Sequence, residues 1–238
     1  MIYQPDLDIL TVDFAPDDLF LYFTIRLFAM NSEGGDLQGA YAIEFDRTFT
    51  GRGDLLVTVK DPAFEWSTEG VVVYGDKNRD VGGPQPVIAD AGFNGSGYDM
   101  TVVMEGDKVA WARVDPKDGN AVQFAISRAL LDNPAGFAWG AWADNGLMDP
   151  TKFDYNDTMG PTAAGSPIKD KYYPVKALYS LDNTCRLPYG LEQTGSVPGM
   201  CKIGIQPVVS DGSCRPICLQ WSYVAYPPVC LRWGTTCN

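Results

Sequence analysis

The chain has 238 residues, of which 45% are apolar and 20% charged, a composition typical of a globular protein large enough to bury a full core. Thirty acidic and 18 basic residues give a net charge of −12, which disfavours binding to nucleic acid or to an anionic membrane surface. Histidine is absent, and this excludes serine triads, cysteine–histidine dyads and histidine-ligated zinc sites.

Short apolar and β-branched runs separated by turn residues predict strands in the first half of the chain. Two such runs, 8–14 and 19–28, flank Pro16-Asp17-Asp18 and predict a hairpin. A long polar loop joins 40–45 to 54–59 in a second hairpin. Further strands are expected at 69–74, 97–104, 109–114 and 122–126.

The segment 127–132 is the one short helical candidate, with Ser127 as its cap and Asn133-Pro134 as its end. The run 137–143, which alternates small and aromatic residues, predicts a last core strand. We therefore predict an all-β fold, an antiparallel β-sandwich of the immunoglobulin or jelly-roll kind, with about eight strands.

Cysteine occurs only in the last quarter of the chain, where an even count in a turn-rich segment predicts disulfides. A zinc–thiolate cluster is the weaker interpretation because no Cys-x2-Cys pair is present. We expect a sandwich over 1–178 and a small disulfide-stapled extension over 179–238, with Cys185 and Cys201 as a natural local pair. The six residues are Cys185, Cys201, Cys214, Cys218, Cys230 and Cys237.

Disulfides indicate an oxidising compartment, so we expect an extracellular or cell-surface location. No apolar run approaches the roughly 20 residues of a membrane-spanning helix, so direct membrane insertion is not expected. The start, Met1-Ile-Tyr-Gln-Pro5, lacks the basic and apolar regions of a signal peptide. We expect that a signal or anchor segment was removed before Met1.

The extension contains one pattern twice, Cys218-Leu-Gln-Trp221 and Cys230-Leu-Arg-Trp233, with Pro227-Pro228 as the bend between them. This predicts two short strands that face each other. One interpretation is a disulfide-stapled hairpin that stabilises a segment too small for its own core. The other is an aromatic docking surface.

The stretch 76–83 places oxygen-bearing side chains at alternate positions, namely Asp76, Asn78 and Asp80, and ends in two glycines. Calcium binds six to eight oxygens in flexible geometry, so we predict a calcium loop. It is not an EF-hand, because Val81 and Val87 stand where that motif needs glycine and glutamate.

The remaining calcium ligands must come from elsewhere, and the loop 46–54 is the best donor. It presents Asp46 and Asp54 between two neighbouring strands, and loops at one end of a sandwich can converge. The alternative is that all these residues are ordinary turn formers, since Asp, Asn and Gly are common in turns.

Six segments of the chain share an order and loop chemistry with a known family: 19–25, 42–46, 51–54, 66–70, 76–83 and 122–131. With them the chain resembles the DOMON-like β-sandwiches of the carbohydrate-binding family 9 type, over roughly residues 6–144. The resemblance implies an antiparallel sandwich on secreted or surface proteins, often with calcium and sometimes with a sugar or haem site. Haem-binding members use methionine and histidine, so the absence of histidine argues against haem here.

Sugar-binding members hold a pyranose between aromatic rings, and the candidates in this chain are Trp66, Trp139 and Trp142. A tryptophan in a strand is more often a core residue than a ligand platform. The loop setting of Trp66 favours the ligand role.

Our leading hypothesis is a non-catalytic, calcium-stabilised binding module of the cell exterior, with carbohydrate or another cell-surface component as its partner. The alternative is a structural or assembly protein, such as a filament, layer or adhesin subunit, that uses the extension for self-association. A glycosidase that uses two carboxylates is the third possibility, and no paired acid favours it over loop chemistry.

Overall fold

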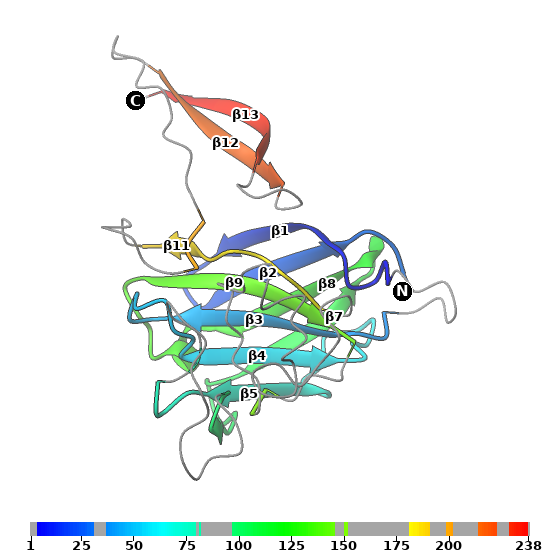
Figure 1. Cartoon of the computed structure of the whole chain (residues 1–238), viewed down its shortest axis with the longest axis vertical. Coiled ribbons are helices and arrows are strands. Elements are labelled where there is room, and N and C mark those ends of the chain that lie inside the picture. The colour runs from blue at the N-terminus through cyan, green and yellow to red at the C-terminus, as the bar shows by residue number, and fades with distance from the viewer. Residues whose placement is uncertain are drawn as a thin grey trace, which may run out of the picture.

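The computed structural model describes residues 4–30, 37–79, 81, 97–145, 150–151, 181–190 and 199–201, and the backbone of 214–222 and 229–237. All the strand pairs are antiparallel, and they form two sheets with a separate two-stranded hairpin (Figure 1). The predicted all-β fold is confirmed. Within these ranges no helix is long and apolar enough to cross a membrane.

The four-stranded sheet has the order β1-β2-β8-β7. Its first two strands form the predicted hairpin, whose turn is held by the Asp17 carboxylate, because Oδ1 accepts hydrogen bonds from the backbone N–H of Leu19 and Phe20 at 2.8 and 2.6 Å. The strands are β1 (Ile9–Pro16), β2 (Phe20–Leu27), β7 (Ala110–Asp115) and β8 (Asp118–Ser127).

The seven-stranded sheet has the order β10-β9-β3-β4-β5-β6, and β11 also pairs with β9. The second predicted hairpin is its β3–β4 pair. The strands are β3 (Ala40–Asp46), β4 (Leu55–Lys60), β5 (Val71–Gly75), β6 (Met100–Thr101), β9 (Phe137–Asp144), β10 (Leu181–Asn183) and β11 (Leu187–Tyr189).

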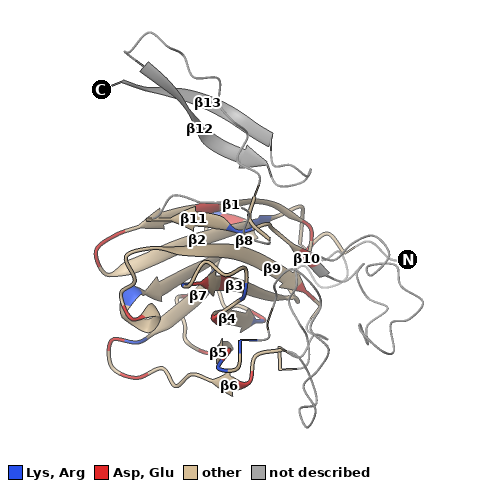
Figure 2. Ribbon diagram, turned by 60° about the vertical axis from the view of Figure 1, so that its left-hand side comes forward, with Lys and Arg blue, Asp and Glu red and all other residues tan. Residues whose placement is uncertain are grey.

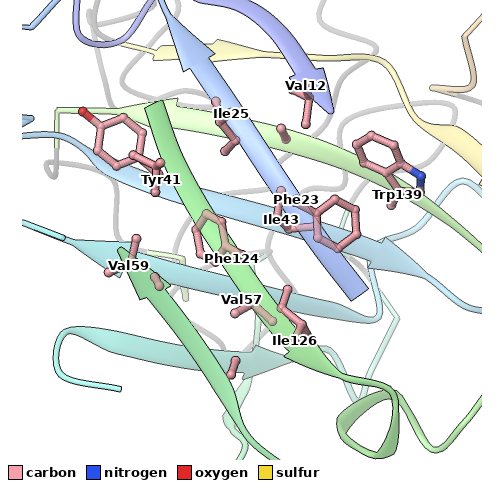
Figure 3. Packing of buried hydrophobic residues seen from close by; sticks show 14 of the residues in the cluster. Val12, Phe23, Ile25, Tyr41, Ile43, Val57, Val59, Phe124, Ile126 and Trp139 are labelled. Atoms are coloured by element: carbon pink, nitrogen blue, oxygen red, sulfur yellow. The ribbon is translucent and has the colours of Figure 1, made fainter. Parts of the chain in front are cut away.

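The main core lies between these two sheets and is built largely from alternate residues of their longer strands (Figure 3). Phe23 packs against Phe45 and Trp139 with ring centroids 5.7 and 5.0 Å apart. Burying a side chain of this size stabilises the fold by about 1.5–3 kcal/mol. Charged residues lie mainly in loops and at strand ends, whereas the strands are largely uncharged (Figure 2).

The seven-stranded sheet is also covered on its outer face. Ala42, Leu56 and Trp142 point away from the main core and pack with Val81 and Tyr98 in a second, smaller cluster. This explains why β9 is buried at every position while β2 alternates.

The predicted short helix is present as a 3-10 helix, η1 (Arg128–Leu131). Ser127 caps it, because its hydroxyl oxygen accepts a hydrogen bond from the backbone N–H of Leu130 at 3.2 Å. Asp132 ends it in the left-handed conformation, with φ of 62°.

The predicted boundary at 178/179 lies just before two strands of the sandwich. Strands β10 and β11 both pair with β9, so residues 181–189 extend the seven-stranded sheet. The predicted Cys185–Cys201 disulfide is confirmed, and it joins the link between these strands to residues 199–201. Arg186 forms an isolated parallel bridge with Met200 in the same region.

The predicted hairpin of the extension is confirmed as β12 (Cys214–Ser222) paired with β13 (Val229–Cys237). Its register places Cys218 opposite Trp233 and Trp221 opposite Cys230, so each cysteine of the repeat faces a tryptophan position. Disulfides at Cys214, Cys218, Cys230 and Cys237 stay predictions, because their side chains lie outside the described set.

Candidate functional site

The two loops predicted to hold calcium lie side by side at one end of the sandwich. The backbone N–H of Asp76 donates to the carbonyl oxygen of Asp54 at 3.0 Å, where β4 begins and β5 ends. The predicted convergence of these loops is therefore present in the backbone. Whether their carboxylates form an ion site depends on what each oxygen contacts.

The Asp46 carboxylate is fully buried and organises its own loop. Its Oδ1 accepts hydrogen bonds from the backbone N–H of Thr48 and Thr50 at 3.0 and 3.3 Å, and its Oδ2 accepts one from Gly51 at 2.7 Å. These charge-assisted bonds hold the 46–51 turn. This is the arrangement of a turn-forming aspartate.

Asp54 is also buried and accepts a hydrogen bond from the backbone N–H of Arg47 at 2.5 Å. Burial raises the pKa of Asp54, the Arg47 amide and guanidinium oppose that rise, and the neighbouring Asp46 carboxylate adds to it. A nearby cation would favour the charged form of this group.

In the 76–83 loop, Asp76 accepts from the backbone N–H of Arg79 at 2.7 Å and of Val81 at 3.1 Å. The amides of Lys77 and Asn78 donate to the two carboxylate oxygens of Asp99, each at 3.1 Å. Asp99 lies 21 residues after Asn78, and no spacing or motif in the sequence connects it with this loop.

The described residues alone do not complete a calcium site. No group of three or more aspartate, glutamate or cysteine side chains within them is arranged to hold a metal ion. Asp80, the third predicted ligand of the loop, lies outside the described residues, so the calcium loop stays a prediction.

Two of the three candidate ligand-binding tryptophans are core residues. Trp139 is 4% exposed and packs among Phe14 and Phe23 in the main core. Trp142 is 2% exposed and lies in the second cluster. They are three residues apart on one strand, so they point to opposite faces of the sheet, and neither presents a ring to solvent.

Trp66 is on the surface, 39% exposed, in the segment that joins β4 to β5. This segment lies along β7, because the backbone groups of Ser67 and Ala112 exchange hydrogen bonds at 3.1 and 3.0 Å. The guanidinium carbon of Arg113 lies 4.4 Å from the centre of the Trp66 ring. Trp66 thus borders the outer face of the four-stranded sheet.

A row of alternating small and aromatic residues crosses that outer face. Tyr22 is opposite Ala15 on one side and Ala125 on the other, and Ala125 is in turn opposite Trp111. Residues directly opposite in a sheet share a face. We call this set the ring row: Ala15, Tyr22, Ala125 and Trp111.

The two rings of this row are supported from one end by Phe20. Its ring centroid lies 6.1 Å from that of Tyr22 and 5.6 Å from that of Trp111. Partial burial and the adjacent Asp17 carboxylate, which accepts a hydrogen bond from the Tyr22 hydroxyl, raise the pKa of Tyr22. Tyr22 is still 36% exposed, so its ring is available to a ligand.

Beside the ring row runs a second set, the polar row, formed by the next outward-facing residues: Asp13, Thr24, Gln123 and Arg113. Arg113 Nε donates to Gln123 Oε1 at 2.8 Å, and Gln123 Nε2 donates to Asp115 Oδ2 at 3.2 Å. The side chains of Arg113 and Gln123 are therefore held in a chain of hydrogen bonds that ends at Asp115. The outer face thus carries ring surfaces and hydrogen-bonding groups in adjacent lines.

A cavity of about 480 Å³ lies at the end of the sandwich where β4 and β9 finish. Its lining includes the apolar Met30, Leu37 and Phe64 and the polar Lys60 and Asp61. Phe64 is 59% exposed and is not part of the four-stranded sheet, so a Phe64 variant can serve as a control for variants of the aromatic residues on that sheet.

A buried ionic cluster on the outer face of the seven-stranded sheet was not expected from the sequence. Arg186 donates through Nε and Nη2 to Oε2 of Glu44 and through Nη1 to the carbonyl oxygen of Gly51 at 2.9 Å. Tyr98 donates its hydroxyl hydrogen to Oε1 of Glu44 at 2.8 Å. Burial, followed by the charge of Glu44, raises the pKa of Tyr98.

Comparison with known proteins gives no relative: no family model, no curated protein and no solved structure matches the chain. The resemblance to DOMON-like sandwiches therefore stays a prediction.

Proposed function

We propose that this protein is a non-catalytic, extracellular or cell-surface module that binds carbohydrate on the outer face of the four-stranded sheet. The observation that carries the proposal is the ring row with the polar row beside it. A pyranose has apolar C–H faces and hydroxyl edges, so it binds best where aromatic rings and hydrogen-bonding side chains lie next to each other.

The setting of Trp66 supports the same proposal. Its exposed ring borders this face beyond β7 and stacks on Arg113, which belongs to the polar row. Stacking on an aromatic ring limits the freedom of the arginine side chain. Arg113 therefore has little entropy to lose when a ligand hydroxyl binds.

The charge of the protein favours an uncharged partner. At a net charge of −12, an anionic polymer would be repelled at long range, whereas a neutral glycan would not. Disulfide use, seen at Cys185–Cys201, is consistent with the proposed oxidising location.

Calcium at the 76–83 loop is the second part of the proposal. Asp76 and Asn78 stand at alternate positions, and the backbone of Asp76 is hydrogen-bonded to that of Asp54 in the neighbouring loop. These are residue types that calcium binds, and their loops are adjacent. Such an ion would stabilise the loop and would be remote from the ring row.

The test is retention of the full chain on insoluble polysaccharides and on a glycan array. We expect wild-type protein to bind at least one neutral glycan, Trp111→Ala to weaken binding about tenfold or more, and Phe64→Ala to leave it unchanged. Near-ultraviolet circular dichroism would verify that both variants are folded.

Bound polysaccharide should show no new reducing ends after prolonged incubation, in agreement with a non-catalytic module. If no glycan is retained and the protein instead polymerises as its concentration rises, the assembly role replaces the binding role.

A further inference from the structure

The two rings of the ring row lie two strand spacings apart. Tyr22 and Trp111 lie on β2 and β7, with Ala125 of β8 between them. Neighbouring strands are 4.7–4.9 Å apart, so the Cα atoms of these two residues are separated by about 10 Å. Ala125 is 7% exposed, so the small residue between the two strands is covered and adds little surface of its own.

We infer that this face binds an extended, uncharged β-1,4-linked polysaccharide that lies across the strands, with every second sugar on a ring. The inference rests on the proposed function. In such a chain successive sugars are turned over, so the same face recurs once per disaccharide, a repeat close to two strand spacings. An α-1,4-linked chain curves into a helix and cannot place successive flat faces on a flat row.

The polar row fits the edges of the same chain. Its members are two residues further along each strand, which places them about 7 Å from the ring row. A ribbon-shaped glycan lying on Tyr22 and Trp111 would direct its hydroxyl edge towards Thr24, Gln123 and Arg113. Bonds to hydroxyl groups need both donors and acceptors, and this row supplies both.

The surrounding charges favour an uncharged chain over an acidic one. Arg26, the next cation on this face, is already paired with Asp13 at 3.2 Å and Asp118 at 2.8 Å. A carboxylate on the ligand would therefore lie near the carboxylates of Asp13 and Asp118 as well as near Arg113. Like charges placed close together oppose binding.

The length of the ligand provides the sharpest test. A chain must be three sugars long to cover both rings, with its first and third sugars on Tyr22 and Trp111. Titration calorimetry with β-1,4-linked gluco-oligosaccharides should therefore show an increase of about tenfold in affinity from disaccharide to trisaccharide. In Tyr22→Ala and in Trp111→Ala this step should disappear, while Phe64→Ala should retain it. α-1,4-linked oligosaccharides of equal length, and a β-1,4 glucan oxidised to carry carboxylates, should bind about tenfold more weakly or worse.

Each outcome bears on a different statement. Preference for the α-linked or the oxidised chain, or a smooth rise of affinity without a step, would overturn the inference and leave carbohydrate binding intact. Absence of binding to any glycan would overturn both. Dimerisation of wild-type protein that Trp111→Ala abolishes, measured by light scattering, would assign the ring row to a second copy of the chain instead.

Discussion

Arg186 and Glu44 form an ion pair that is closed to solvent on both sides, with each side chain 1% exposed and Nη2 2.8 Å from Oε2. The two residues are 142 positions apart in the chain. Arg186 comes from the cysteine-containing region and Glu44 from the middle of β3. Their contact therefore ties the segment 181–190, which carries β10 and β11, to the seven-stranded sheet by a buried charge as well as by backbone pairing.

Neutralising Glu44 should be severely destabilising. Glu44→Gln preserves the shape but leaves the Arg186 charge buried without a counter-charge, which costs about 3–5 kcal/mol. Urea unfolding followed by tryptophan fluorescence measures this loss. Glu105→Gln, an exposed change in a turn, is the matched control and should stay within about 0.5 kcal/mol. A loss below about 1 kcal/mol for Glu44→Gln would show that the pair is not sealed from water.

Removing the Cys185–Cys201 bond should weaken the same contact. The bond closes a loop with a sequence separation of 16, and loops of this size contribute about 3 kcal/mol. Cys185→Ser/Cys201→Ser should lose about that much in denaturant unfolding. Because Arg186 adjoins Cys185, this double change and Glu44→Gln should be non-additive in a mutant cycle. Strict additivity would mean that the disulfide does not position Arg186.

Gly53 is adjacent to the buried carboxylate and has no room for a side chain. A Cβ there would contact Oε1 of Glu44 and the hydroxyl of Tyr98. We expect Gly53→Ala to cost about 1–3 kcal/mol, since extra atoms in a packed site force neighbours to move. Gly119→Ala, where only the tip of Met30 is near, should be almost neutral by the same unfolding assay. Equal effects of the two changes would contradict this packing.

Asp6 should make stability depend on pH in the acid range. Burial raises the pKa of Asp6 above 3.8, against the opposing effect of hydrogen bonds from the backbone of Asp6 and Gln38. Its Oδ1 is buried without a hydrogen-bond partner. The folded state therefore keeps the Asp6 proton to a higher pH than the unfolded state. The contribution of Asp6 to the free energy of unfolding falls as the pH rises from 3.8 to the folded pKa, and it is constant above that pKa.

Asp6→Asn has no such proton, so its stability relative to wild type should increase as pH is raised from the acid range to neutrality. Urea unfolding of both proteins across that range gives the difference. A difference that does not change with pH would remove Asp6 as the source.

Chelation should lower the melting temperature if the 76–83 loop holds calcium, because an ion that binds only the folded state stabilises it. We expect EDTA to lower the midpoint, calcium to restore it, and Asp76→Asn to abolish the response. Asp107→Asn, which removes a carboxylate from an exposed turn, should respond to EDTA and calcium like wild type. Identical melting curves with and without EDTA would withdraw calcium from the proposed function.

Local signals in the sequence were sufficient for the individual elements. The turn at Asp17 and the cap at Ser127 depend on hydrogen bonds within three residues, so composition and spacing reveal them. The proximity of Asp54 and Asp76 could also be predicted, because Asp54 directly precedes one strand and Asp76 directly follows its neighbour.

The site itself depends on register between distant strands, which spacing does not encode. In the sequence, Tyr22 and Trp111 are typical strand residues. Only the register of β2 and β7 with β8 shows that they lie on one face with Ala125 between them. The burial of Arg186 could not be predicted from its neighbours in the sequence. It depends on the contact with Glu44, which is distant along the chain. Trp139 and Trp142 were candidates for the surface, and full coverage of β9 by two clusters made them core residues.

The attachment of β10 and β11 also determines how the protein should be produced. Without them, β9 would present an unpaired edge of eight largely apolar residues, which is a template for aggregation. The Cys185–Cys201 bond keeps those short strands in place, so expression in a reducing cytoplasm should yield aggregates that an oxidising compartment avoids. The yield of soluble protein in the two compartments should thus depend on a bond that is no part of the surface proposed to bind the ligand.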